Sequence, residues 1–185
     1  NSHLESLKNI DGVFKVKSEI VKNIKKNGFL VVPNDNKKHL NKWKKMRSDI
    51  TTISFGMKDD SDFYPIDVKI KQNGLSFLVT SRLIEKPIKI SSSLEGVHNV
   101  KNILSACAVH YCLGQNLQDF SKLISLSKLD NLRQVKYKWL KGSTLIDDSY
   151  NANPDSTKKS IDLLSNYNKK TVLLLGDMLE LGRYK

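Results

Sequence analysis

Apolar residues in the first part of the chain recur first with helical spacing and then as a short run. Between residues 9 and 26 they return every three or four positions, which predicts a helix that Asn27-Gly28 ends. Residues 29–32, Phe-Leu-Val-Val, predict a short buried strand that is closed at Pro33. A helix followed by a buried strand is typical of an α/β layer, and residues 37–48 then predict a basic surface helix.

The middle of the chain predicts a β-hairpin and two helices. Apolar and polar residues alternate over 66–80 on both sides of Asn73-Gly74, a dipeptide that favours a tight turn between strands. Helices are predicted over residues 99–113 and 117–127, and Gly114 is expected to end the first of them in the left-handed conformation. Cys107 falls on the apolar side of that helix and is expected to be a core residue.

The last third of the chain predicts a βαβ unit. Residues 128–143 are polar and basic, and we place a domain boundary in this connection, after residue 133. A strand over 144–146, a helix over 154–166 and a strand over 171–175 are expected to follow. Such a unit usually makes a parallel pair with a right-handed crossover.

Composition narrows the class of protein. The 185 residues are 39% hydrophobic and 27% charged, which is typical of a globular protein. No apolar run approaches the roughly 18 residues that span a bilayer. The two cysteines, Cys107 and Cys112, are too few for a disulfide framework or a four-thiolate zinc site. We expect a cytoplasmic protein, and the abrupt ends at Asn1 and Lys185 favour a piece of a longer one.

The net charge of +12 raises the possibility of a nucleic-acid-binding module. Lysine dominates the 31 basic residues and is spread over the whole length, whereas base and phosphate recognition favours the planar fork of arginine. The pattern therefore favours solvated lysine faces with a general attraction for anionic ligands, nucleotides included. The nucleic-acid alternative predicts steeply salt-dependent binding.

Lys17 is the first candidate for chemistry. It follows Ile10 by seven residues and Val13 by four, on the apolar side of the predicted helix. An ammonium that faces a core is costly unless it is paired or neutralised. The side chain therefore either reaches outward to water, or forms an ion pair, or is modified into an anion. His3, with Glu5, is a weaker signal that fits either a metal ligand or a surface histidine.

A second candidate site is the segment from Gly96 to Asn102. Asn99 and Asn102 are three residues apart at the start of the predicted helix and therefore share a face. Helix N-termini attract anions, and an amide side chain can pair with an adenine-like base. The alternative is that Asn99 is an ordinary N-cap.

The strongest candidate follows the strand predicted over residues 144–146. Asp147 and Asp148 stand at its carboxyl end, where open α/β sheets bind ligands. Asn153 can cap the next helix and Pro154 fits its first position. The five residues 147–151 exceed what a connection needs, so we interpret them as a site. A second acidic segment, residues 176–182, follows the strand predicted over 171–175.

Taken in order, these motifs resemble the Mur ligases. The resemblance is carried by residues 147–154, Asp-Asp-Ser-Tyr-Asn-Ala-Asn-Pro, by residues 175–182, and by the segments 3–5, 15–20 and 96–102. It implies an α/β fold in two parts. Residues 1–133 would be the later part of a P-loop-type central ATPase domain with a small antiparallel hairpin. Residues 134–185 would contribute the first βαβ of a Rossmann-like C-terminal domain.

The resemblance also implies a reaction. ATP phosphorylates a substrate carboxylate and an amine attacks the acyl phosphate, while Mg²⁺ and cationic groups offset the phosphoryl charge. The Asp-Ser-Tyr-Asn-Ala-Asn run implies addition of D-alanyl-D-alanine to UDP-N-acetylmuramoyl-tripeptide in peptidoglycan precursor synthesis. Another ATP-dependent amino acid or glutamate ligase of the superfamily is the alternative. The implied partners are these small molecules rather than nucleic acid, and the implied state is a monomer.

Individual residues receive roles from the same resemblance. Lys17, as a carbamate, and His3 are the implied metal-binding residues, and Lys17 and Arg133 are the implied catalytic residues. The implied ATP-binding residues are His98, Asn99, Asn102, Arg133 and Asp148, and the implied substrate-binding residues are Tyr150, Asn151 and Asn153.

Two features depart from the family pattern. The glycine-rich, lysine-bearing phosphate loop is absent from these residues, and Asn131-Leu132 precedes Arg133 where the family usually has Pro-Gly. We expect the loop and a UDP-binding domain to lie upstream of Asn1, and the 185 residues alone to be inactive.

Overall fold

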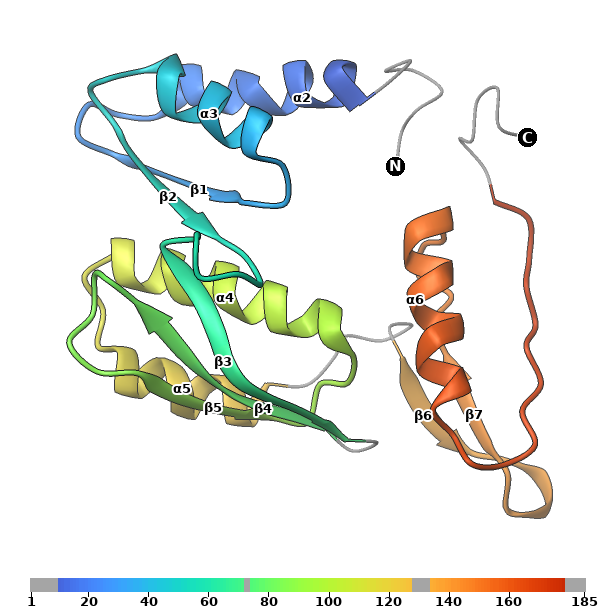
Figure 1. The fold of residues 1–185 in the computed structure, drawn as a ribbon. Helices are drawn as coiled ribbons and strands as arrows, with labels where there is room; N and C mark the ends of the chain where they lie inside the picture. The colour runs from blue at the N-terminus through green and yellow to red at the C-terminus, as the bar shows by residue number, and fades with distance from the viewer. Residues whose placement is uncertain (1–9, 72–73, 128–133, 179–185) are drawn as a thin grey trace. The chain divides into compact units, whose positions relative to one another are not determined.

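The structure is a computed structural model that describes residues 10–71, 74–127 and 134–178 (Figure 1). They fall into two compact units. One is Phe14–Ser127, and the other holds the described residues of Asn1–Val13 and Lys128–Lys185. Both units mix helices with strands, which confirms the α/β class. Within the described ranges, every helix is too short or too polar to cross a membrane.

A five-stranded mixed sheet forms the centre of the larger unit. Its order is β1-β2-β3-β4-β5, with parallel pairing from β1 to β3 and antiparallel pairing from β3 to β5. β2 and β3 are in register only at Phe55 and Phe63. Beside that pair, the Asp62 carboxylate accepts hydrogen bonds from Ser54 N at 2.7 Å and from Ser54 Oγ at 2.6 Å. The strands are β1 (Phe29–Pro33), β2 (Thr51–Phe55), β3 (Phe63–Lys71), β4 (Gly74–Ser81) and β5 (Ile88–Ser92).

Two helices share one hydrophobic core with this sheet. α4 (Val97–Cys112) lies along one face (Figure 1), and α5 (Leu117–Leu126) packs on β5, where Ser121 Oγ donates to Lys89 O at 2.6 Å. The core between α4 and the sheet is fully buried and includes Phe63, Val79, Ile90, Leu104 and Cys107. The prediction that Cys107 is a core residue is confirmed.

A second, smaller core lies on the opposite face of β1. Leu30 and Val32 point into it, while the intervening Val31 packs against the first core, as the period of two in a strand requires. The other buried members are Val21, Leu40 and Trp43, which come from η1 (Glu19–Asn23) and α3 (Lys37–Met46). β1 is therefore enclosed on both faces, which explains its continuous apolar sequence.

The smaller unit is built from a hairpin and a helix. β6 (Val135–Lys138) pairs antiparallel with β7 (Thr144–Asp147), and the short helix η2 (Leu140–Gly142) turns between them. Lys141 and Gly142 both have positive φ, at 55° and 75°, which makes the turn tight. α6 (Pro154–Ser165) follows β7.

Most predicted elements are confirmed. They include the strand at residues 29–32, the 66–80 hairpin, and the helices expected near residues 37–48, 99–113, 117–127 and 154–166. Gly114 has a φ of +67°, as expected for a left-handed helix end. The helix predicted over 9–26 is α-helical only in α2 (Ile10–Ser18) and continues as the 3-10 helix η1 to Asn23.

Three predictions about the strands need correction. β2 and β5 were not predicted, because their Thr and Ser residues interrupt the apolar pattern. Residues 128–143 are not only a connection, since they contain β6, and β7 pairs antiparallel with it. Residues 171–175 form no strand in the structure. Their four apolar residues, 172–175, are exposed and have no ladder partner among the described residues, so the expected second strand of the βαβ unit is not formed.

Candidate functional site

The first turn of α4 holds a buried amide pair. Asn99, only 4% exposed, donates from Nδ2 to Glu95 O at 2.8 Å, and its Oδ1 accepts from Asn102 Nδ2 at 3.0 Å. Asn99 is the third residue of the helix and Gly96 occupies the cap position, so the N-cap alternative for Asn99 is wrong. The hydrogen bonds fix the orientation of Asn99 and present the exposed Asn102 at the surface.

His98 and Gly96 shape the same turn. Gly96 has a φ of +86°, and a Cβ added there would lie 2.7 Å from His98 Cε1, so the imidazole packs directly over the glycine. A glycine is needed here both for the backbone angle and for the ring. The segment is therefore preorganised around its polar side chains.

A polar cluster that sequence reasoning missed lies at the carboxyl end of β1. Asn34 Nδ2 donates to Asp60 Oδ1 at 2.9 Å, and Lys37 forms an ion pair with Asp60 at 3.0 Å. Asp35 pairs with Lys101 at 2.5 Å, which joins the residues after β1 to the first turns of α4. The signal in the sequence is the Asn-Asp-Asn run that follows an apolar strand, since ligands bind at the carboxyl ends of strands in α/β sheets.

Lys17 does not face a core. Its side chain is exposed, and the residues of this segment that pack into the small core are Phe14, Val21 and Ile24. The predicted stripe does include Lys17, but it continues into Ile20, which is 60% exposed. The helix has apolar residues on two sides and only one of them is packed, so apolar spacing alone could not tell which side is buried.

The loop between β7 and α6 carries the third group of candidates. Asp147 Oδ1 accepts from Ser149 N at 3.0 Å, and Asp148 Oδ2 accepts from Ser160 Oγ at 2.5 Å. Asp148, Tyr150 and Asn151 are exposed. Asp148 therefore ties the loop to α6 and Asp147 bonds within the loop, while the middle residues of the loop face solvent.

Asn153 caps α6, as predicted. Its Oδ1 accepts from Ser156 N at 2.9 Å, and Ser156 Oγ accepts from Asn153 N at 3.0 Å, which completes a capping box. Pro154 follows at the first helical position, also as predicted. The cap uses Asn153 Oδ1, so a substrate-binding role for Asn153 would use its Nδ2 group.

The structure assembles the predicted residues into separate groups. Asn99 and Asn102 are hydrogen-bonded to each other, whereas Asp148, Tyr150, Asn151 and Asn153 share one loop of the other unit. His3 and Arg133 lie outside the described residues. Among the residues that are described, no three His, Cys, Asp or Glu side chains lie close enough to hold a metal ion.

One open hollow of about 520 Å³ lies at the far end of α4. The turn between β4 and β5 and the turn between α4 and α5 line it, with Leu83, Ile84, Tyr111 and Leu117 among its residues. None of the predicted site residues that the structure describes lines this hollow.

Burial also decides the chemistry of the thiols. Desolvation raises the pKa of Cys107 to about 12 and that of the half-buried Cys112 in the same direction. A thiol that stays protonated is a poor nucleophile. Neither cysteine is therefore a candidate catalytic group.

Comparison with known proteins identifies the family. Residues 1–110 match the Mur ligase middle domain, and residues 133–185 match the glutamate ligase domain of the Mur ligases. The chain belongs to the Mur ligase family.

Several relatives of this Mur ligase chain carry the same name at similar identity. It is 32% identical to the UDP-N-acetylmuramoyl-tripeptide–D-alanyl-D-alanine ligase of Buchnera aphidicola subsp. Baizongia pistaciae, over 99% of the chain and 39% of the relative. It is 33% identical to the Haemophilus influenzae enzyme of that name, over 98% of the chain and 38% of the relative. The chain thus spans about two fifths of the curated relatives it matches.

Solved structures agree with the fold of this Mur ligase chain. Crystal structure I of MurF from Acinetobacter baumannii has a TM-score of 0.88 at 25% identity and covers 98% of the chain and 39% of its own. MurF from Thermotoga maritima, solved with ADP, has a TM-score of 0.80 at 24% identity, over 98% of the chain and 40% of its own. The second likeness concerns the fold alone.

Proposed function

We propose that this chain is part of an ATP-dependent ligase that joins D-alanyl-D-alanine to UDP-N-acetylmuramoyl-tripeptide. The observation that carries the proposal is the similarity, along nearly the whole chain, to ligases of that name at 29 to 33% identity. L-Alanine-adding Mur ligases match at 27 and 22% over 89 and 86% of the chain. The Asp-Ser-Tyr-Asn-Ala-Asn run on the β7–α6 loop supports the same choice.

The proposed reaction has two steps. A carboxylate oxygen of the tripeptide attacks the γ-phosphorus of ATP, the bond from that phosphorus to the bridging oxygen breaks, and ADP leaves. The amine nitrogen of the dipeptide then attacks the acyl carbon, the carbon–oxygen bond to phosphate breaks, and the amine releases a proton. Because both steps move charge between oxygen atoms, catalysis depends on cations and hydrogen-bond donors that are fixed beforehand.

The larger unit would hold the nucleotide. The oriented amides of Asn99 and Asn102 suit the edge of an adenine, and His98 packs beside them. The residues around Asn34 and Asp35 lie at the carboxyl end of β1, where α/β sheets bind ligands, and Lys101 links them to α4. Asp148 would contact the ribose, and Arg133 would reach the phosphates.

Lys17 and His3 are the proposed metal-binding residues. The exposure of Lys17 fits a side chain that must meet CO₂ to become a carbamate and then face a ligand. Mg²⁺ typically takes one or two protein ligands and completes its shell with water and phosphate oxygens. A carbamate and a histidine would supply those two protein ligands, and bound Mg²⁺ would neutralise charge at the phosphates.

The smaller unit would approach the substrates. Tyr150 and Asn151 face solvent on a loop that Asp148 and the α6 cap hold at both ends. We propose them, with Asn153, as the substrate-binding group. The boundary between the two Mur domains after residue 133 belongs to the proposal and is supported by the match of residues 133–185 to the second domain. A cytoplasmic monomer is the proposed form.

The test is phosphate release by the full-length protein. With ATP, Mg²⁺ and UDP-N-acetylmuramoyl-tripeptide, we expect release with D-alanyl-D-alanine and at least about 100-fold less with L-alanine, glutamate or diaminopimelate, because a site built to hydrogen-bond one amine strongly rejects analogues. Mass spectrometry should show the amide product. Preference for a single amino acid would favour the alternative, another ligase of the superfamily.

A further inference from the structure

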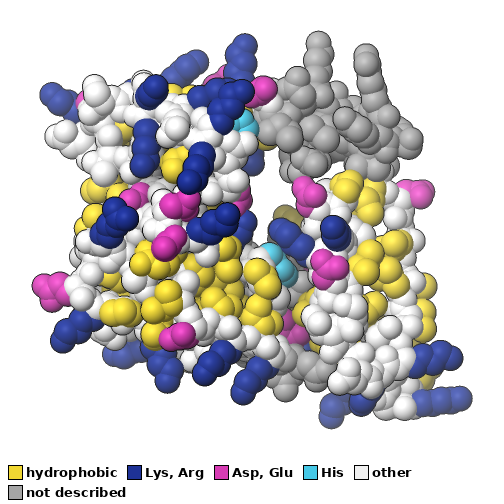
Figure 2. Space-filling view, in the orientation of Figure 1, with side chains coloured by type: hydrophobic (Ala, Val, Ile, Leu, Met, Phe, Trp, Pro, Cys, Tyr) yellow, Lys and Arg dark blue, Asp and Glu magenta, His cyan; other side chains and the backbone are white. Residues whose placement is uncertain are grey.

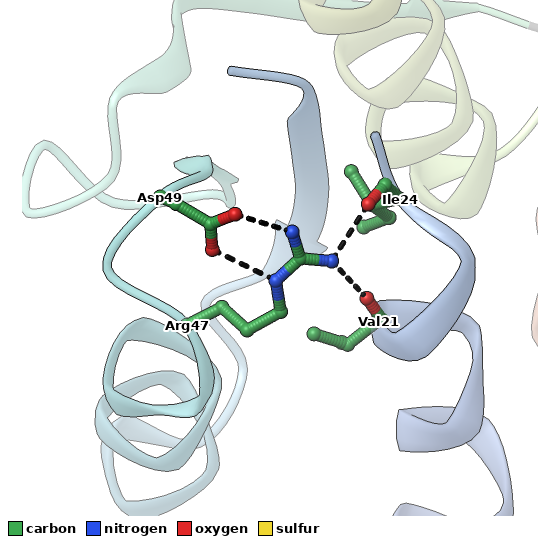
Figure 3. A network of polar contacts seen from close by, with 4 residues as sticks. All are labelled: Val21, Ile24, Arg47 and Asp49. Carbon is green, nitrogen blue, oxygen red and sulfur yellow. Dashed lines mark hydrogen bonds and ion pairs between the residues drawn. The ribbon is translucent and has the colours of Figure 1, made fainter. Parts of the chain in front are cut away.

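Arg47 closes the end of the helical segment that carries Lys17 (Figure 3). Its Nη1 donates to Val21 O at 2.9 Å and to Ile24 O at 2.6 Å. Both carbonyls lie at the C-terminal end of η1, where Ile24 is the C-cap residue and Val21 O also accepts from Ile24 N at 3.4 Å. A guanidinium satisfies them and places a positive charge at the negative end of the helix.

Asp49 holds Arg47 in this position. Arg47 Nε donates to Asp49 Oδ1 at 2.8 Å and Nη2 donates to Asp49 Oδ2 at 2.6 Å, so the pair is bidentate. The Arg47 guanidinium lowers the pKa of the Asp49 carboxyl, and Asp49 raises the pKa of Arg47. Asp49 O also accepts from Asn27 N at 2.8 Å, which ties the turn after η1 to the same residue.

The Arg47–Asp49 pair contacts the end of a helical segment that changes from α-helix to 3-10 helix next to Lys17. α2 ends at Ser18 and the segment continues as the tighter η1 from Glu19. Runs of 3-10 helix have poorer hydrogen bonds than α-helix, so they depend on outside contacts. Val21 packs in the small core and Arg47 fixes its carbonyl, and together they set the rotation of the segment in which Lys17 is exposed.

We propose that Arg47 and Asp49 form a positioning pair that fixes the orientation of Lys17 for the phosphoryl-transfer step. The inference rests on the proposed function, because it gives the pair no role unless Lys17 acts in that reaction. Neither residue is proposed to touch the substrate. The pair acts through the helix end, so its loss should affect the same step as loss of Lys17.

The experiment is a double-mutant cycle in the full-length protein. Arg47→Gln is expected to lower kcat about tenfold while KM for ATP changes less than about twofold, because the nucleotide contacts on α4 are untouched. Arg47→Lys keeps the positive charge but loses the planar guanidinium, so its kcat should lie between those of the wild type and Arg47→Gln. In a Lys17→Ala background, Arg47→Gln should change the single-turnover rate by less than about twofold.

A matched control separates positioning from stability. Phe120→Ala opens a cavity in the larger core, on α5 and outside the small core that Val21 joins, and should lower Tm at least as much as Arg47→Gln, yet leave kcat unchanged below the transition. An equal loss of rate from Arg47→Gln with and without Lys17 would overturn the positioning role and leave the proposed function standing. Full activity of Lys17→Ala would overturn both the role of Lys17 and this inference.

Discussion

At the scale of single residues, Asn99 shows how burial redirects a polar side chain. It stands near a helix start, where asparagine usually caps. Here the glycine before the helix takes the cap position, and the amide turns back to Glu95 O and across to Asn102. Leaving the Glu95 carbonyl without that donor would cost about 1–3 kcal/mol, so Asn99 stabilises the fold whether or not it also contacts a ligand.

Gly96 offers a test of this turn. Gly96→Ala should destabilise the protein by about 1–3 kcal/mol, because φ of +86° suits glycine. The new Cβ would also displace the His98 ring, so KM for ATP should rise roughly tenfold. Thermal unfolding and steady-state kinetics of the full-length protein measure the two effects.

Gly114→Ala is the matched control for that substitution. Gly114 also has a positive φ, +67°, but no atom lies within 4 Å of its added Cβ. Gly114→Ala should lower the free energy of unfolding by about 1–2 kcal/mol and leave KM for ATP unchanged. A rise in KM for both variants would mean that stability, and not the turn at Gly96, controls the affinity.

At the scale of elements, apolar spacing predicted the enclosed strand and the long helices well. β1 lies between two cores and α4 packs along the sheet, so their sequences carry the period that packing requires. The spacing failed where an element is held by something else. β2 is half-exposed and joined to β3 through Ser54 and Asp62, and nothing in its pattern reveals that contact.

The candidate site was predictable only in part, for a related reason. The cap of α6 is local in sequence, so the roles of Asn153 and Pro154 could be predicted directly, whereas the return bond from Asn153 N to Ser156 Oγ was not predicted. The amide bond from Asn102 to Asn99 is also local, but the burial of Asn99 depends on the sheet beneath α4. The exposure of Lys17 depends on which side of α2 the small core selects, and that is a tertiary choice.

Asn153 allows its structural and functional roles to be separated. Serine caps helices as well as asparagine does, whereas Asn153→Ala should cost about 1 kcal/mol. We expect Asn153→Ser to keep the wild-type Tm but lower kcat/KM for D-alanyl-D-alanine by roughly tenfold, because the amide is lost. If Asn153→Ser matched the wild type in both measurements, capping would be its whole role.

At the scale of the whole molecule, the two units differ in how much they bury. Every buried apolar residue of the described chain lies in Phe14–Ser127, and no residue described between 134 and 178 is buried. Figure 2 shows Lys and Arg side chains scattered over the face of the molecule in view, with Asp and Glu among them. The spread argues for a solvated basic surface and against a single stripe for nucleic acid.

This difference predicts the course of limited proteolysis. When the 185-residue chain is treated with trypsin, we expect cleavage first after lysines between residues 134 and 178, because local opening is easiest where little apolar surface is buried. A resistant fragment that contains Phe14–Ser127 should persist, as mass spectrometry can establish. Early cleavage within α4 or β4, at a rate equal to that in the smaller unit, would contradict the expectation.

The seam between β2 and β3 governs the order in which the large sheet can assemble. β3, β4 and β5 are joined by short turns, so their contacts are local and close quickly. β1 and β2 are connected through α3. β2 then pairs with β3 in register at a single residue pair, beside the Ser54–Asp62 contacts. We therefore expect pairing between β2 and β3 to come late in folding, so that a substitution of Asp62 should accelerate unfolding more than it slows folding.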